Sequence, residues 1–241
     1  KGLRYGADTS GANRFLAPKK PAKWTGVQDA FEWGQEAPQS HPHTEIPEVR
    51  ATVQDHPVGE DCLRLNVWTR SAGNGKRPVM VWFHGGSNVS GSTADFVPFP
   101  GYETVRLYDG HTLSRTGNVI VVTVNYRLNA FGFFGLSELA SEDPAYPYAG
   151  NQGLLDQRAS LQWVKENIAA FGGDPANVTI FGESAGSFDV CAHMVSPMSA
   201  GLFHKVIGES GGCTVGVATA ESAALHTCRP MASRPLMRAP S

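Results

Sequence analysis

Short apolar runs and one long amphipathic stretch dominate the middle of the chain. Residues 62–68 alternate between apolar and polar positions, which predicts a strand with one exposed side and with Leu63, Leu65 and Val67 on the other. Val206 begins a further strand. Three more runs are almost continuously apolar, as is typical of strands buried on both faces: residues 79–83, 118–125 and 178–181.

The longest helical pattern covers residues 153–171. Its apolar positions recur at the spacing of one helical face, at Leu154, Leu161, Val164 and Ile168. The glycine pair at 172–173 predicts the end of this helix, and residues 174–175 (Asp-Pro) predict a turn. Residues 185–195 favour a second helix. Strands that alternate with helical segments predict an α/β fold, with a mainly parallel sheet flanked by helices.

Other segments carry no such period. Residues 1–56 are rich in Gly, Pro, Ala and polar side chains. Residues 19–23 and 41–43 are interpreted as loops, with His41 and His43 solvated rather than metal-bound. Residues 88–112 are interpreted as a long irregular connection. The pattern therefore predicts two regions, a partial α/β domain over residues 1–218 and an irregular tail over residues 219–241.

Composition excludes several classes of protein. The 241 residues include 20 Lys and Arg against 22 Asp and Glu, and 41% of them are hydrophobic. This hydrophobic content excludes a wholly disordered chain, and the near-zero net charge argues against a nucleic-acid partner. Because no run of about 18 apolar residues occurs, the sequence predicts no membrane-spanning helix.

The cysteines leave two alternatives open. They stand at positions 62, 191, 213 and 228, without any C-x-x-C pair, so no zinc ribbon or thioredoxin-type motif is present. They form either two disulfides or four buried thiols. The second alternative is favoured, because a chain of this length buries a large core without covalent links.

Residues 182–186 read Gly-Glu-Ser-Ala-Gly, a match to G-x-S-x-G. In a nucleophile elbow, a sharp strand-to-helix turn lifts the serine, here Ser184, out of the sheet. The N–H of the next residue, Ala185, then lies at a helix start, where negative charge is stabilised. Residues 208–212 match the pattern again, around Ser210. That second match runs into Gly-Gly-Cys-Thr, a poor helix start, so the strand–turn–helix requirement selects Ser184.

Residues 84–87 read His-Gly-Gly-Ser and follow a predicted buried strand directly. Alone, this segment is a glycine-rich turn. Together with an elbow about 100 residues later, it is typical of the loop that supplies the other N–H groups of an oxyanion hole. Glycine suits this role because the backbone itself must approach the substrate.

Several blocks in order, which include these two motifs, resemble the type-B carboxylesterase/cholinesterase family of α/β-hydrolases. The resemblance implies that the chain is the N-terminal portion of an α/β-hydrolase fold. The blocks are residues 60–63, 65–67, 81–86, 125–128, 150–157, 161–164, 171–175 and 178–187.

The resemblance also implies an activity, the hydrolysis of carboxylic esters through an acyl-serine intermediate. Ser184 is then the nucleophile, and the oxyanion hole takes N–H groups from Gly86, Ser87 and Ala185. It implies a small-molecule ester as substrate, with no metal and no organic cofactor. The family usually has a third glycine where Ser87 stands, so this side chain is expected to reshape the acyl pocket. No cysteine precedes Cys62, so the disulfide that some members form at its position is not expected.

The remaining triad members are harder to place. Chain order in this fold is serine, acid, histidine, so three histidines follow the candidate nucleophile in the right direction. His193 lies inside the predicted helix 185–195, and His204 precedes a strand. His226, with Glu221 as its acid, has the right order but lies in the irregular tail. The sequence therefore predicts a nucleophile and an oxyanion hole without a convincing base.

Three interpretations of this gap stay open. The chain is the N-terminal part of a longer esterase whose C-terminal segment, or a second chain, supplies the acid and histidine; it is a truncated or frame-shifted product; or it uses an improvised base. The first is favoured. The alternative from another class is a non-catalytic hydrolase-fold binding protein or an inactive fragment. Localisation stays open: the unpartnered Cys62 favours a reducing, cytoplasmic compartment, while Lys1 in place of Met keeps secretion as an alternative.

Overall fold

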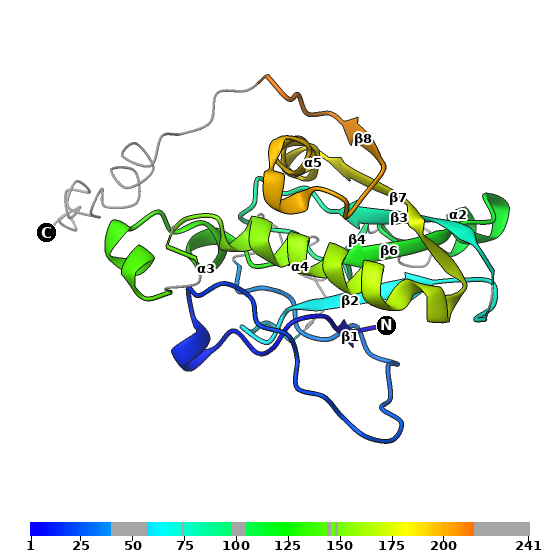
Figure 1. Cartoon of the computed structure of the whole chain (residues 1–241), viewed down its shortest axis with the longest axis horizontal. Coiled ribbons are helices and arrows are strands. Elements are labelled where there is room, and N and C mark those ends of the chain that lie inside the picture. The colour runs from blue at the N-terminus through cyan, green and yellow to red at the C-terminus, as the bar shows by residue number, and fades with distance from the viewer. Residues whose placement is uncertain (40–56, 74, 98–104, 144–145, 148, 215–241) are drawn as a thin grey trace, which may run out of the picture.

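A six-stranded mixed sheet forms the centre of the molecule (Figure 1). The computed structural model describes residues 1–39, 57–73, 75–97, 105–143, 146–147 and 149–214. In spatial order, the strands are β1 (Leu3–Arg4), β2 (Arg64–Trp68), β6 (Ile120–Val124), β3 (Arg77–Phe83), β7 (Gly173–Glu183) and β8 (Lys205–Glu209).

The sheet is mainly parallel, as predicted. Strands β6, β3, β7 and β8 pair in parallel, whereas β1 and β2 pair antiparallel with each other and β2 pairs antiparallel with β6. All five residues of β6 are buried, which confirms that this strand is covered on both faces. Parallel strands need crossover connections, and the helices that cover the sheet provide them.

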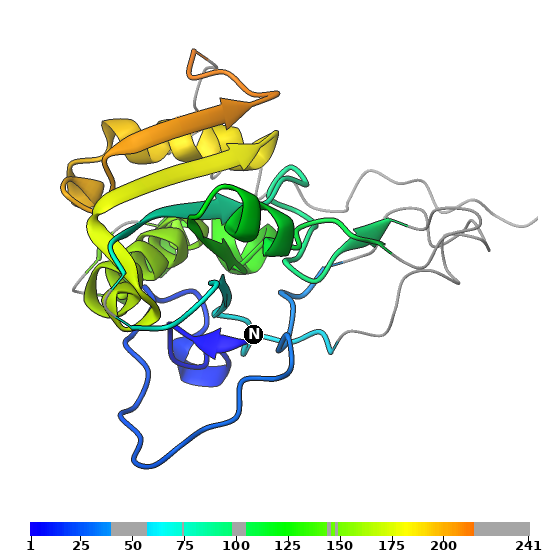
Figure 2. The ribbon, with the colours of Figure 1, turned by 90° about the vertical axis from the view of Figure 1, so that its right-hand side faces the viewer.

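Helices lie on both faces of the sheet. Helix α4 (Gln152–Asn167) and helix α5 (Ala185–Val195) contact β7 and share one face, as Figure 2 shows. The core between this face of the sheet and the helices includes alternate residues of β3 and β6. It contains Val79, Val81, Phe83, Ile120, Val122 and Val124 from the strands, together with Leu161, Val164 and Ile168. Side chains alternate between the two faces of a strand, so Val121 points away from this core. It lies against Gly110, just before helix α2 (His111–Thr116), so α2 covers the other face of the sheet.

The helix boundaries follow the predicted pattern closely. The amphipathic stretch forms α4 and then a 3₁₀ turn, η3 (Ile168–Phe171), which ends at Gly172 with a left-handed φ of 81°. The second predicted helix, residues 185–195, coincides with α5. The shorter elements are α3 (Asn129–Phe133), η1 (Gly11–Asn13), η2 (Ser137–Ser141) and η4 (Pro197–Ser199).

The prediction that one side of the strand at residues 62–68 is exposed is wrong. Asn66, on the side expected to face solvent, is only 1% exposed. Its Oδ1 accepts the N–H of Gly2, and its Nδ2 donates to Thr93 Oγ1 and Thr123 Oγ1. The N-terminal segment and the region after β3 therefore cover this face, which local alternation could not reveal.

Two other predictions need correction. Residues 88–112, expected to be irregular throughout, contain strand β4 (Phe96–Val97), which pairs with β5 (Val105–Arg106), and the start of α2. The expected turn at residues 174–175 lies inside the bounds of β7, where the register with β3 shifts. Asp174 Oδ1 accepts the N–H of Ala176, so a local turn forms within a strand irregularity. The predicted tail, 219–241, lies outside the described residues.

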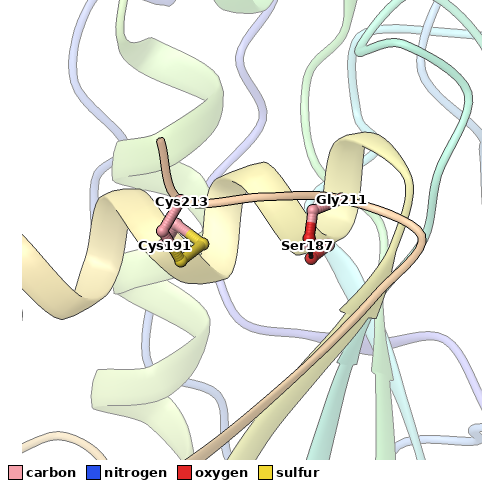
Figure 3. The surroundings of a disulfide bond; sticks show 4 residues. All are labelled: Ser187, Cys191, Gly211 and Cys213. Atoms are coloured by element: carbon pink, nitrogen blue, oxygen red, sulfur yellow. Dashed lines mark hydrogen bonds between the residues drawn. A yellow bond between two sulfur atoms is a disulfide. The ribbon is translucent and has the colours of Figure 1, made fainter. Parts of the chain in front are cut away.

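A disulfide joins Cys191 of α5 to Cys213, in the segment after β8 (Figure 3). This contradicts the favoured alternative of four buried thiols. Cys62 is buried and free, as expected, and Cys228 lies outside the described residues. Disulfides persist in oxidising environments, so the bridge removes the argument for a reducing compartment that Cys62 offered. Next to the bridge, Ser187 Oγ donates to the carbonyl of Gly211.

Loss of this disulfide is expected to destabilise the protein by about 3 kcal/mol, because the bridge closes a loop of 22 residues in the unfolded chain. The variant for this test is Cys191→Ala/Cys213→Ala, compared with the unchanged protein by urea unfolding without reductant. Reductant should lower the stability of the unchanged protein to that of the variant. Equal unfolding midpoints for the two oxidised samples contradict this prediction.

Candidate active site

The parallel strands bring the candidate residues to one edge of the sheet. Strand β3 is followed by His84, β7 by Ser184 and β8 by Ser210. Phe83 is in register with Gly182, and Glu183 with Glu209, so these carboxyl ends lie side by side. In open α/β sheets, ligands bind beyond the carboxyl ends of the strands.

Ser184 forms the turn between β7 and α5. Its φ of 53° and ψ of −118° place a residue with a side chain in a strained region of backbone conformation. The side chain is half-buried, and the residue stands at the N-cap position of α5. This is the strand–turn–helix geometry of a nucleophile elbow.

The two glycines of the motif make this turn sterically feasible. A Cβ on Gly182 would lie 2.5 Å from the backbone carbon of Gly186. A Cβ on Gly186 would overlap the carbonyl oxygen of Phe83 at the end of β3. Both positions therefore require glycine, because three backbones meet here.

The second motif match adopts only part of this geometry. Ser210 also has a positive φ, of 53°, and the Ser184 N–H donates to the carbonyl of Glu209. However, residues 211–214 form no helix, so no helix N-terminus faces the exposed Ser210. The prediction that Ser210 is a turn residue at a strand end agrees with this arrangement.

The loop after β3 lies against the elbow. A Cβ on Gly85 would be 3.2 Å from Ser184 Cβ and 2.9 Å from Glu183 Oε2. Gly86 has a φ of 108° and Ser87 a φ of 56°. Gly86 is partly exposed and Ser87 is exposed, so this part of the loop lies at the surface.

The backbone N–H groups of the candidate oxyanion hole are available. Within the described part of the chain, no protein acceptor takes the N–H of Gly86 or Ser87. Ala185 is the first residue of α5, and its N–H precedes the point at which intrahelical bonds begin. The structure thus brings Gly85 and Ser184 close together, with these three donors on the elements that flank them.

Three of the described histidines are engaged elsewhere. His84 is buried and stacks on Tyr126, and burial lowers its pKa to about 4. His193 bonds Gln157 and Ser199, and His204 Nδ1 accepts the N–H of Val178. Among the residues that the structure describes, no histidine bonds Ser184. His226 and Glu221 lie outside that part.

Sequence reasoning missed a buried polar chain beside the elbow. Asn88 Nδ2 donates to Asp189 Oδ1 at 3.0 Å, and Gln157 Nε2 donates to Asp189 Oδ2 at 2.6 Å. Burial raises the pKa of Asp189 to about 6, although both hydrogen bonds favour its ionised form. Burial also lowers the pKa of His193 to about 4. The signal in the sequence was a charged residue five positions after Ser184, in a helix whose other residues except His193 are apolar or small.

A surface cavity of about 360 Å³ lies beside the same loop. It extends from Ser87 toward α3, and its walls are mainly apolar. The lining residues are Ser87, Asn88, Val89, Asn129, Ala130, Phe133 and Phe134. An apolar group of a small ligand would fit here, next to a candidate oxyanion donor.

The described residues contain no group of three His, Cys, Asp or Glu side chains arranged to hold a metal ion. None of the helices described has the length and apolarity that crossing a membrane requires.

Comparison with known proteins gives a consistent picture. The model of the carboxylesterase family matches residues 1–237. A para-nitrobenzyl esterase from Bacillus subtilis is 44% identical over 216 residues, covering 88% of this chain and 39% of that protein. An acylcarnitine hydrolase from Mus musculus is 37% identical, covering 98% of this chain and 41% of that protein. The chain thus spans about two fifths of the length of these relatives.

Solved structures agree with these sequence matches. The crystal structure of the Geobacillus stearothermophilus carboxylesterase EST55 superposes with a TM-score of 0.79 at 42% identity. The superposition covers 94% of this chain and 42% of that one. A thermophilic PNB esterase superposes with a TM-score of 0.78 at 41% identity, covering 94% of this chain and 43% of that one. The predicted α/β-hydrolase fold is therefore confirmed.

Proposed function

Because this chain belongs to the carboxylesterase family, we propose that it carries the nucleophile and the oxyanion hole of a carboxylic ester hydrolase. One observation carries the proposal. Ser184 occupies a strained strand-to-helix turn, directly against the glycine loop that follows β3. Strain at such a position is maintained when the surrounding structure demands it, and it exposes the hydroxyl beyond the sheet.

The reaction follows from this placement. Ser184 Oγ attacks the ester carbonyl, and the carbonyl oxygen becomes an oxyanion. The N–H groups of Gly86, Ser87 and Ala185 stabilise that charge, with help from the N-terminal end of α5. Collapse of the tetrahedral species expels the alcohol and leaves an acyl-serine. Water then attacks the acyl group and releases the carboxylic acid.

A base must take the proton of Ser184 during the attack. We assign this base, and the acid that orients it, to residues outside the described part of the chain or to a second chain. The buried His84 and His193 do not fit the role, because their ring nitrogens bond Gly85, Ser199 and Gln157, and neither bonds Ser184. Without a base the serine hydroxyl is a weak nucleophile.

The cavity beside Ser87 supports a substrate with a compact apolar group. Its apolar walls and its contact with the oxyanion loop favour esters over charged metabolites. The name of the Bacillus subtilis relative identifies a p-nitrobenzyl ester as its substrate. A p-nitrobenzyl ester and short p-nitrophenyl esters are therefore suitable probes for this chain.

Covalent labelling tests the proposal most directly. A fluorophosphonate is expected to form a bond between Ser184 Oγ and phosphorus, with fluoride leaving and the hydroxyl proton passing to the base. Peptide mass spectrometry should place the adduct on Ser184 and not on Ser210, and Ser210→Ala should still be labelled.

An adduct on Ser210, or equal labelling of both serines, contradicts the choice of nucleophile. A folded protein without an adduct favours the second candidate, a non-catalytic hydrolase-fold binding protein. The observation behind that candidate is that none of the described histidines bonds Ser184.

A further inference from the structure

The two sides of the oxyanion hole lie on separate elements. Gly86 and Ser87 belong to the loop after β3, whereas Ala185 begins α5. Stabilisation of an oxyanion requires donors at about 2.7–3.1 Å from the position that the oxygen reaches. The loop and the helix must therefore keep a fixed relative position, although the loop side is exposed at Ser87.

A hydrogen bond between two side chains joins these two sides. Asn88 directly follows Ser87, and Asp189 lies one helical turn beyond Ala185. The Asn88 Nδ2 donates to Asp189 Oδ1 at 3.0 Å. The bond therefore connects the residue beside one oxyanion donor to the helix that presents the other.

The helix end of this contact is held firmly. Asp189 is 4% exposed, and its second carboxylate oxygen accepts Gln157 Nε2 of α4 at 2.6 Å. Gln157 is itself fully buried and bonds His193 Nε2 at 3.0 Å. A charge-assisted bond from each side leaves the carboxylate little freedom to rotate.

The loop end is held equally well. The Asn88 Oδ1 accepts the hydroxyl of Tyr126 at 3.2 Å, and its carbonyl accepts the N–H of Asn129 at 2.8 Å. Because the Tyr126 hydroxyl has one proton, it shares this proton between Asn88 Oδ1 and the carbonyl of His84, which is closer, at 2.7 Å. Asn88 has a φ of 58°, a conformation that asparagine adopts more readily than most residues.

We propose that Asn88 and Asp189 are positioning residues, whose hydrogen bond holds the Ser87 N–H in place relative to the Ala185 N–H. The proposal rests on the proposed ester hydrolase function. It assigns the buried Asp189 to oxyanion geometry rather than to proton transfer, because both of its oxygens already accept side-chain N–H groups.

An exchange of the two side chains provides the sharpest test. Asn88→Asp alone replaces the amide donor by a second carboxyl group, so at a pH above the pKa of both groups the two carboxylates repel each other and the bond is lost. In Asn88→Asp/Asp189→Asn, the new amide donates to the new carboxylate and its oxygen can still accept Gln157. We expect Asn88→Asp to lower the kcat for p-nitrophenyl acetate by about 10- to 100-fold, below the full loss of one oxyanion donor. KM should change less than kcat, and the double exchange should recover most of the lost rate.

Ser199→Ala is the matched control. It removes a hydrogen bond at the far end of the same buried chain, on the other side of His193. Its kcat should stay within twofold of the unchanged protein. Amide hydrogen exchange over residues 85–91 gives a readout that needs no catalysis. The hydrogen exchange should accelerate in Asn88→Asp and return to the rate of the unchanged protein in Asn88→Asp/Asp189→Asn. In Ser199→Ala it should stay at that rate. Exchange within α4 reports whether each variant has folded.

The outcomes separate this inference from the proposed function. The positioning role is overturned if Asn88→Asp changes neither kcat nor the amide hydrogen exchange over residues 85–91. It is also overturned if Asn88→Asp/Asp189→Asn restores neither of these two quantities. Faster amide hydrogen exchange in Asn88→Asp without any change in kcat overturns the positioning role as well. If the unchanged protein shows no Ser184-dependent hydrolysis, the proposed function fails, and the amide exchange alone decides whether the bond fixes the loop.

Discussion

Replacement of Ser184 by alanine is expected to lower the kcat of ester hydrolysis by about 10⁴- to 10⁶-fold, the loss that follows removal of a catalytic serine. The physical reason is that the acyl-serine route disappears, and water alone must attack the carbonyl. The proposed oxyanion donors on Gly86, Ser87 and Ala185 belong to the backbone and survive the change. The variant should therefore still bind substrate, and a small residual rate should remain.

The measurement is the hydrolysis of p-nitrophenyl acetate and of a p-nitrobenzyl ester by the two proteins. Ser210→Ala is the matched control, because Ser210 stands in the same motif on the neighbouring strand. Its effect should be far smaller than that of Ser184→Ala. If the unchanged protein is no faster than Ser184→Ala, the ester hydrolase proposal fails for this chain.

Replacement of Arg127 by methionine is expected to destabilise the fold by about 3–5 kcal/mol, as is typical when one partner of a buried ion pair is removed. Arg127 and Asp156 are at most 1% exposed. Arg127 Nε and Nη2 donate to the two carboxylate oxygens at 2.8 and 2.7 Å, and Nη1 donates to the carbonyl of Leu16 at 2.9 Å. The substitution leaves a carboxylate in the core without its counter-charge.

A second variant separates this electrostatic effect from the loss of packing. In Arg127→Met/Asp156→Asn no buried charge remains, and the new amide oxygen can still accept the backbone N–H of residue 127, as Asp156 Oδ2 does now. Urea unfolding should show that the double variant recovers more than half of the lost stability. If the double variant is no more stable than Arg127→Met, the unpaired charge is not the cause.

The sheet and its two main helices were predictable because each satisfies a local rule. The run at residues 178–181 is apolar except for Thr179, and it lies within β7 between two neighbouring parallel strands. The helix at 185–195 follows a strand and a glycine turn, and it coincides with α5. The choice of Ser184 over Ser210 depended on the same local rule, since only one of the two serines precedes a helix.

The failures share a physical cause: each depends on contacts between segments far apart in the chain. Asn66 is buried because Gly2 and Thr93 reach it. The partner of Cys191 lies 22 residues away, across η4 and β8, and spacing alone cannot select it. The bond between Asn88 and Asp189 joins a loop to a helix 101 residues later. No local pattern contains these pairings.

The crowding around Gly182 and Gly186 has a consequence for the descent of this family. Both glycines are required by the meeting of backbones, whereas Ser184 between them is required only by the proposed reaction. A lineage that abandons catalysis loses the selection for serine but keeps the steric demand for the glycines. In such descendants the two glycines should therefore persist, and the residue at the position of Ser184 should indicate whether catalysis has been retained.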